Sequence, residues 1–277
     1  MAITAQDINK LRQLTGVGMM DCKKALTEAG GDFDKAIELL RKKGQKVAAA
    51  RAGRATTEGL VLAQVNEASN YGAIIALSCE TDFVAKNEAF QQLAQHMMEA
   101  ALVHQPADLE ALTKLAVAGL TIQAQITELI GKMGENIALS AYETLSSAVV
   151  VPYIHTGSKL GVLVGLQGGT GEKVIEAGKD VAMQIAAMNP RAVDKDGVDA
   201  TVVEQELAIA REQASNEGKP PAMLEKIAQG RLNKFFKDNT LLSQPFVKDN
   251  ALTVAQYLAK VAPSLTVADF KRVSVGS

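Results

Sequence analysis

The fold of this chain is decided by residues 59–79, which read GLVLAQVNEASNYGAIIALSC. Residues 60–67 alternate apolar and polar side chains, and Ser69-Asn-Tyr-Gly72 is typical of a turn. Residues 73–79 are almost continuously apolar, as expected for a buried strand. An amphipathic segment at 87–102 follows and predicts a helix. Together these features predict a β-hairpin covered by a helix.

The same order of elements returns later in the chain. Residues 148–155 are rich in β-branched side chains, 156–158 form a turn, and 161–166 are again densely apolar. A second amphipathic helix is expected at 172–188. A hairpin followed by a helix, twice, predicts an α+β fold with two subdomains and antiparallel sheets, not a doubly wound parallel sheet. Residues 106–119 and 121–131, between the two units, are expected to be helical.

The N-terminal residues predict three short helices. Thr4 and Asp7 form a capping-box pattern, Gly16 and Gly18 precede the second helix, and Gly30-Gly31 ends it. The third helix begins after Asp32, and Lys42-Lys-Gly44 is typical of a helix C-terminus, so we expect it to end there. Residues 51–59 then have the composition of a flexible linker.

Residues 201–238 carry a different pattern. Apolar residues stripe two helices on either side of Gly218-Lys-Pro-Pro221, which reverses the chain. The pattern predicts an antiparallel helical hairpin. It either docks on the body of the protein or projects as an association arm.

Composition and charge exclude several classes of protein. The 277 residues are 47% hydrophobic and have a formal net charge of −2, with two cysteines. Residues 1–54 are basic, at +5, and the rest is acidic, at −7. This balance argues against broad affinity for nucleic acid. No apolar run approaches the length of a membrane span, and no signal peptide pattern is present. We therefore expect a cytoplasmic protein that binds neither membrane nor nucleic acid.

No catalytic constellation emerges from the sequence. Cys22 precedes two lysines that favour a thiolate, but it shares a helix face with apolar residues and is expected to pack in a core. His96, His104 and His155 lack metal-ligand spacing, and His155 is expected to lie beside a turn. Gly168-Gly-Thr-Gly171-Glu-Lys departs from a phosphate-binding loop at its glutamate. We expect no catalytic residue, no metal and no cofactor.

Apolar side chains in unusual places point instead to protein binding. Met19 and Met20 are adjacent at a helix start, so both cannot point inward. Phe83 lies in Thr81-Asp82-Phe83-Val84, on a connection between a strand and a helix. It either presents its ring to a partner or folds back as a lid on the local core.

Several blocks of the chain resemble the bacterial translation elongation factor Ts family. Residues 11–26, LRQLTGVGMMDCKKAL, are similar to its N-terminal signature, and residues 31–41 and 80–87 (ETDFVAKN) to its next blocks. The likeness continues through Lys132-Met-Gly-Glu-Asn136, Tyr153-Ile-His155, 178–183 and 229–236, and so covers essentially the whole chain.

The resemblance implies a guanine-nucleotide exchange factor that binds elongation factor Tu, both GDP-bound and nucleotide-free. Thr81, Asp82, Phe83 and Val84 match the family's loop that inserts near the GTPase's Mg²⁺ site. Arg12, Met19, Met20 and His155 match other contacts with the partner. A homodimer or a 2:2 complex is a further expectation. Such a protein makes and breaks no bond, so it is not an enzyme.

The resemblance also implies a domain organisation. The expected parts are a three-helix bundle like the ubiquitin-associated fold at 1–54, core subdomains at 55–146 and at 147–200 with 239–262, a dimerisation hairpin at 201–238, and a short C-terminal module at 263–277.

Two other functions remain open on the residues alone. The N-terminal bundle is compatible with a protein-binding scaffold that has no effect on a GTPase. A thiol-dependent enzyme that uses Cys22 is the second alternative.

Overall fold

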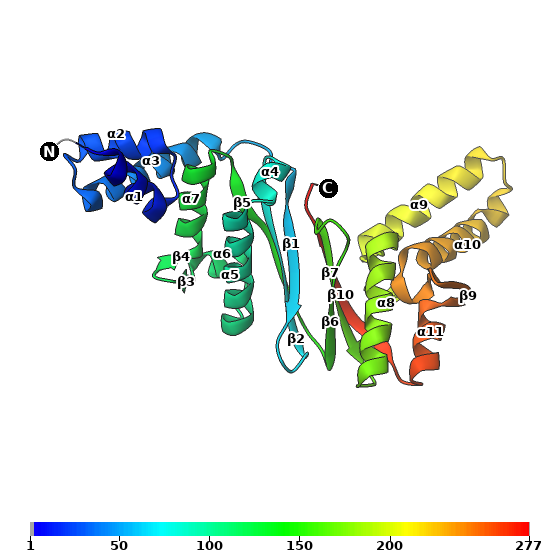
Figure 1. Ribbon diagram of the computed structural model, residues 1–277. Coiled ribbons are helices and arrows are strands. Elements are labelled where there is room, and N and C mark those ends of the chain that lie inside the picture. Colours follow the sequence, from blue (N-terminus) through cyan, green and yellow to red (C-terminus); the bar gives the residue numbers. More distant parts are fainter. Residues whose placement is uncertain (1–2, 277) are drawn as a thin grey trace.

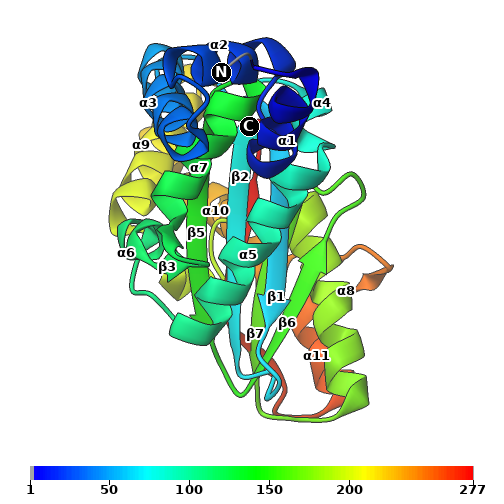
Figure 2. The same ribbon diagram turned by 60° about the vertical axis from the view of Figure 1, so that its left-hand side comes forward.

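A computed structural model of the chain describes residues 3–276 and contains two three-stranded antiparallel sheets that face each other, with helices on their outer sides (Figures 1 and 2). An N-terminal helical bundle extends from one side, and a helical hairpin projects from the other. The predicted α+β class with antiparallel sheets is confirmed.

The first sheet has the strand order β1-β2-β5, and its helices cover the face away from the second sheet. Its elements are β1 (Glu58–Val65), β2 (Tyr71–Cys79), α4 (Asp82–Ala85), α5 (Glu88–His104), α6 (Leu109–Lys114), β3 (Ala116–Val117), β4 (Leu120–Thr121), α7 (Ile122–Met133) and β5 (Ile137–Ser146). The hairpin read from residues 59–79 is therefore present, because β1 and β2 pair from Glu58↔Cys79 to Val65↔Gly72.

The second sheet has the order β10-β7-β6 and is covered by α8 and α11. Its elements are β6 (Val149–Ile154), β7 (Leu160–Gln167), α8 (Glu172–Met188), the 3-10 turns Lys195–Gly197 and Leu241–Ser243, β8 (Pro245–Phe246), β9 (Asp249–Thr253), α11 (Val254–Val261) and β10 (Thr266–Ser274). The second predicted hairpin and helix are both confirmed.

The two sheets pack against each other through buried apolar side chains and a closely packed glycine. Val61, Ile74, Val150 and Leu163 are all buried in the layer between them. A Cβ atom on Gly161 would lie 2.8 Å from the Val61 side chain, so a larger residue there would push the sheets apart. The sheets thus share one apolar layer, which fixes their relative position.

The bundle consists of α1 (Ala5–Thr15), α2 (Met19–Glu28) and α3 (Phe33–Arg51). The capping box predicted at Thr4 and Asp7 is present. However, α3 does not end at Lys42-Lys-Gly44, and this prediction is wrong. The helix continues to Arg51, and Gly44 lies buried inside it, against another helix. The glycine allows close packing there and does not terminate the helix.

The two long strands β5 and β10 escaped the sequence analysis, as did the short strands β3, β4, β8 and β9. In β5, buried residues are spaced irregularly at Ile137, Leu139, Tyr142 and Leu145 because a register shift opposite Ala76/Leu77 interrupts the alternation. Residues 266–274 form β10, which pairs along β7 in the second sheet, while the assignment of 263–277 to a C-terminal module remains a prediction. Residues 106–119 are only partly helical, in α6.

The hairpin consists of α9 (Ala200–Asn216) and α10 (Pro221–Asn239), as the sequence predicts. Buried Ala210 and Ala214 pack between the helices with Ala228 and Leu232. The division of the chain into domains remains a prediction. Among residues 3–276, no helix is long and apolar enough to cross a membrane.

Candidate functional site

Phe83 is the most exposed large apolar side chain among the described residues, with 82% of its surface accessible. It lies on α4, a single helical turn between β2 and α5. Its neighbour Val84 is 7% exposed and belongs to the hydrophobic core between the first sheet and its helices. Because successive helical residues point about 100° apart, burying Val84 turns Phe83 away from the core. The alternative in which Phe83 covers its own core is therefore wrong.

Glu135 holds the start of α4. The backbone N–H of Thr81 donates to Oε2 of Glu135 at 3.0 Å, and the Thr81 hydroxyl donates to Oε1 at 2.6 Å. Glu135 lies in the short connection between α7 and β5, far from Thr81 in the sequence. Both carboxylate oxygens thus fix the residue that precedes the exposed turn.

Glu80 adds a second anchor on the neighbouring residue. Its carboxylate accepts a hydrogen bond from the N–H of Asn136 at 2.7 Å and pairs with Arg54 at 3.3 Å and Arg51 at 3.8 Å. The N–H of Asn136 holds the pKa of Glu80 below its usual range, and Arg54 adds to this effect. The turn that carries Phe83 is therefore tied to the end of α3 as well as to the first sheet.

Asp82 forms an ion pair on the surface of α4. Its carboxylate lies 2.7 Å from Nζ of Lys86, one helical turn later. This hydrogen bond keeps the pKa of Asp82 below its usual range, so the side chain is charged beside Phe83. At such exposure the pair contributes little to stability, and both groups remain available to a partner.

The bundle presents a second apolar surface. Met19 and Met20 are 40% and 66% exposed at the start of α2, and Arg12 is exposed on α1. Leu14, 63% exposed, lies on the neighbouring α1 and was missed by the sequence analysis. A helix turn takes 3.6 residues, so each step of three residues falls short of a full turn. Leu14 therefore points away from the face on which Leu11 is buried.

His155 is exposed at the end of β6, where the sequence places it beside a turn. Its Nδ1 lies 3.0 Å from the hydroxyl of Tyr153, and its backbone N–H donates to the carbonyl of Leu160 at 2.9 Å. The imidazole is therefore oriented by its own hairpin through the Tyr153 hydroxyl.

The turn after His155 lies at the same end of the molecule as α4. The carbonyl of Ser158 accepts from the N–H of Val61 at 2.7 Å, and Lys159 pairs with Glu58 at 2.6 Å. Glu58 begins β1 and stands opposite Cys79, which directly precedes the Phe83 connection. In Figure 1 the bundle and α4 lie along one edge of the molecule. The predicted site residues thus fall on α1 and α2 of the bundle, on α4 and on the turn after β6.

The cysteines offer no accessible nucleophile. Cys22 and Cys79 are both fully buried. Burial raises the pKa of Cys79 to about 12, and the charge of Glu135 adds to this. The Cys22 thiol donates weakly to the carbonyl of Val17 at 3.4 Å, inside the bundle core. The placement of Cys22 supports core packing over a thiol-dependent reaction.

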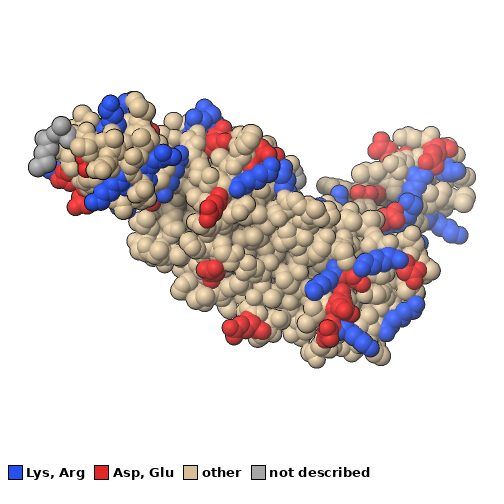
Figure 3. Space-filling model, viewed as in Figure 1, with Lys and Arg blue, Asp and Glu red and all other residues tan. Residues whose placement is uncertain are grey.

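Charge does not gather on the visible face of the molecule. Lys and Arg are intermixed with Asp and Glu at both ends, and the central part carries few charges (Figure 3). This face therefore has no broad basic patch. Among residues 3–276, no three His, Cys, Asp or Glu side chains are placed to hold a metal ion.

Comparisons with known proteins agree on one family. The family model described as elongation factor TS matches residues 80–277. The chain is 74% identical over its full length to elongation factor Ts of Amoebophilus asiaticus (strain 5a2), covering all of that protein. It is 53% identical to elongation factor Ts of Cytophaga hutchinsonii over 99% of both chains. It is 49% identical to the same factor of Porphyromonas gingivalis over 100% of both.

Proposed function

The chain belongs to the elongation factor Ts family, and from this premise we propose that it is a guanine-nucleotide exchange factor for elongation factor Tu. It binds the GDP-bound GTPase, disturbs its Mg²⁺ site and promotes release of GDP during translation elongation. The observation that carries the proposal is a phenylalanine held almost fully exposed on a turn with two anchors. Sequence similarity over the whole chain to proteins named elongation factor Ts supports the choice of partner.

The mechanism follows from how a GTPase holds its nucleotide. The phosphates are bound by backbone amides, by a lysine and by a Mg²⁺ ion that bridges them. Phe83, inserted beside that ion, displaces the groups that order it, while Asp82 brings a negative charge to the same place. Once the Mg²⁺ ion is lost, the diphosphate loses a large part of its stabilisation and dissociates faster. No covalent bond changes, so the protein is not an enzyme in the chemical sense.

Binding of the factor and of GDP must oppose each other. If the factor weakens GDP binding, GDP weakens binding of the factor by the same ratio. The coupling has to be moderate, because the factor must bind the GDP complex first and leave again when a new nucleotide enters. The contact residues we propose are Thr81, Asp82, Phe83 and Val84 on the turn, and Arg12, Met19, Met20 and His155 elsewhere on the same edge.

The direct test measures release of fluorescent GDP from purified elongation factor Tu with and without this protein. We expect release to accelerate with factor concentration and then to saturate. Binding without any change in the release rate would favour a scaffold role and would contradict the exchange function.

The methionines of the bundle are expected to contribute affinity. Met19→Ala combined with Met20→Ala removes two exposed side chains that a partner would bury, so we expect the dissociation constant for the GDP complex to rise about 10- to 100-fold. Isothermal titration calorimetry measures it. Met188→Ala, a similarly exposed methionine at the end of α8, serves as the matched control, with unchanged affinity. An unchanged constant for the double variant would remove the bundle from the contact surface.

The hairpin of α9 and α10 is proposed as a self-association arm. Two ion pairs join its helices on the surface, Arg211 with Glu225 and Arg231 with Glu217, each at 2.7 Å. Ile209 and Met223 remain about half exposed. Replacing residues 203–235 by a short linker should convert a dimer to a monomer in light scattering. An equal number of subunits before and after would argue against the arm.

A further inference from the structure

Helices α3 and α7 cross in backbone contact at Gly44 and Gly131. A Cβ atom on Gly131 would lie 2.8 Å from Cα of Gly44, which is closer than Cβ atoms approach in proteins. The reverse substitution is not equivalent, because a Cβ on Gly44 would lie 3.6 Å from Cα of Gly131, an ordinary contact. Glycine is unfavourable inside a helix compared with alanine. The missing side chain at 131 is therefore what permits this crossing distance.

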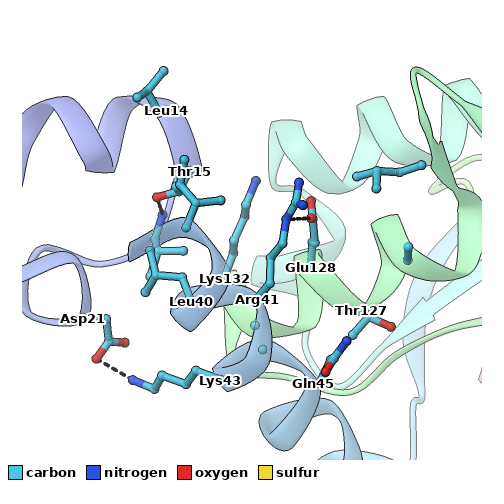
Figure 4. A pocket seen from close by; sticks show the side chains of 16 residues that line it. Leu14, Thr15, Asp21, Leu40, Arg41, Lys43, Gln45, Thr127, Glu128 and Lys132 are labelled. Atoms are coloured by element: carbon cyan, nitrogen blue, oxygen red, sulfur yellow. Dashed lines mark hydrogen bonds and ion pairs between the residues drawn. The ribbon is translucent and has the colours of Figure 1, made fainter. Parts of the chain in front are cut away.

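The bundle meets the first subdomain where α3 packs against α7. Arg41 of α3 pairs with Glu128 of α7 at 3.0 Å, and the Lys132 side chain reaches the end of α1 at Gly16 (Figure 4). Beside the crossing lies a cavity of about 470 Å³, lined by residues of the bundle on one side and of α7 on the other. The two helices are therefore in direct backbone contact at the crossing, whereas the neighbouring part of the interface is a cavity.

One continuous helix links the two bodies. The first half of α3 packs Ala36 and Leu40 into the bundle core. Its second half packs Val47 and Ala48 against the core of the first subdomain. Gly44 lies between these halves. A change in the crossing therefore moves the bundle as a unit relative to the sheet and to α4.

We propose that the Gly44–Gly131 crossing sets the orientation of the bundle, and thereby the position of the Met19–Met20 surface relative to Phe83. Gly131 is a positioning residue for partner binding, since it acts through the helix crossing and is not itself one of the proposed contact residues. The inference rests on the proposed exchange function. The physical argument is that two docking surfaces bind one partner at the same time only when their separation equals the separation of the two sites on that partner.

Gly131→Ala should therefore weaken partner binding and leave the release step intact. The factor concentration for half-maximal GDP release should rise about 10-fold, with the maximal rate within about twofold of the original. In the Gly131→Ala background, Met20→Ala should raise the half-saturating concentration by a smaller factor than in the original protein, because the bundle no longer docks fully.

Two further glycines give matched controls for the same chemical change. Gly44→Ala keeps an ordinary contact at the crossing, and Gly230→Ala in α10 meets no atom within 4 Å. Both should leave half-saturation unchanged. A rise for Gly44→Ala as large as that for Gly131→Ala would overturn the proposal, because it would reflect helix chemistry and not crossing distance.

A measurement without the partner separates this proposal from the exchange function. Nitroxide labels on Thr27→Cys of α2 and His96→Cys of α5, both exposed positions, report the distance between the bundle and the first subdomain by pulsed electron paramagnetic resonance. The native cysteines are buried and should not take the label.

Gly131→Ala should shift this distance by about 1–2 Å, and Gly44→Ala should not. An unchanged distance overturns the proposal, as does a shifted distance with unchanged half-saturation. If the original protein fails to accelerate GDP release, the exchange function is contradicted. The distance measurement needs no partner, so it still tests the role of the crossing independently. A thermal melt confirms that each variant is folded.

Discussion

Phe83→Ala should slow GDP release at saturating factor about 30- to 100-fold while leaving the factor folded. A large aromatic side chain at the centre of a desolvated contact contributes about 2–3 kcal/mol, and each 1.4 kcal/mol corresponds to tenfold in rate. Since the ring is 82% exposed, its loss should change the free energy of unfolding by no more than about 0.5 kcal/mol. Stopped-flow release of fluorescent GDP measures the rate, and urea unfolding measures stability.

The decisive quantity is the maximal rate and not the affinity alone. A residue that acts while the metal site opens lowers the maximal rate, whereas a residue that only aids docking raises the concentration needed for half saturation. Val103→Ala is the matched control, because Val103 is 74% exposed in the last turn of α5, far along that helix from α4. A Phe83→Ala factor with an unchanged maximal rate would contradict the proposal that Phe83 displaces the groups that order the Mg²⁺ ion.

Glu135→Ala should produce the second largest decrease in the maximal rate of GDP release, although Glu135 does not belong to the proposed contact surface. The change leaves the N–H and the hydroxyl of Thr81 without their acceptor, so the start of α4 is no longer fixed. We expect the maximal rate of GDP release to fall about 10-fold, in line with a cost of 1–3 kcal/mol for such unpaired groups. The same stopped-flow assay measures it.

Glu135→Gln distinguishes positioning from charge. The amide oxygen accepts from the N–H of Thr81, and the amide NH₂ donates to the Thr81 hydroxyl, whose proton rotates away. Both hydrogen bonds survive, so exchange should stay within about twofold of the original. Equal losses in Glu135→Gln and Glu135→Ala would show that the negative charge matters, and that the anchoring role assigned here is mistaken.

Sequence reasoning found the parts of the fold whose pattern is local. The hairpin at 59–79 combines an alternating run, a turn and a dense apolar run, the helix at 172–188 is amphipathic, and both elements are present. The strand β5 was missed because one extra residue at its bulge shifts the phase of burial. Gly44 was misread because a helix-ending glycine and a helix-packing glycine look identical until the partner helix is placed.

The same limit applies to the site. Exposed Phe83 was found because a large apolar residue on a connection is unusual, although its orientation stayed open until the burial of Val84 was known. The anchors Glu135 and Arg54 could not have been found by spacing, since they join Thr81 and Glu80 only through the tertiary fold. The signal for them is a charged residue in a short connection, which is common and therefore uninformative alone.

The position of β10 constrains how this chain is made. Its partner β7 emerges from the ribosome much earlier, and α8, the long hairpin and α11 come between them. Until β10 arrives, the second sheet has an unpaired edge at β7, which is a template for pairing with other chains. The first subdomain needs no such late segment, since β1, β2 and β5 precede β6. Nascent chains should therefore acquire protease resistance in two stages, with the second half depending longer on chaperones.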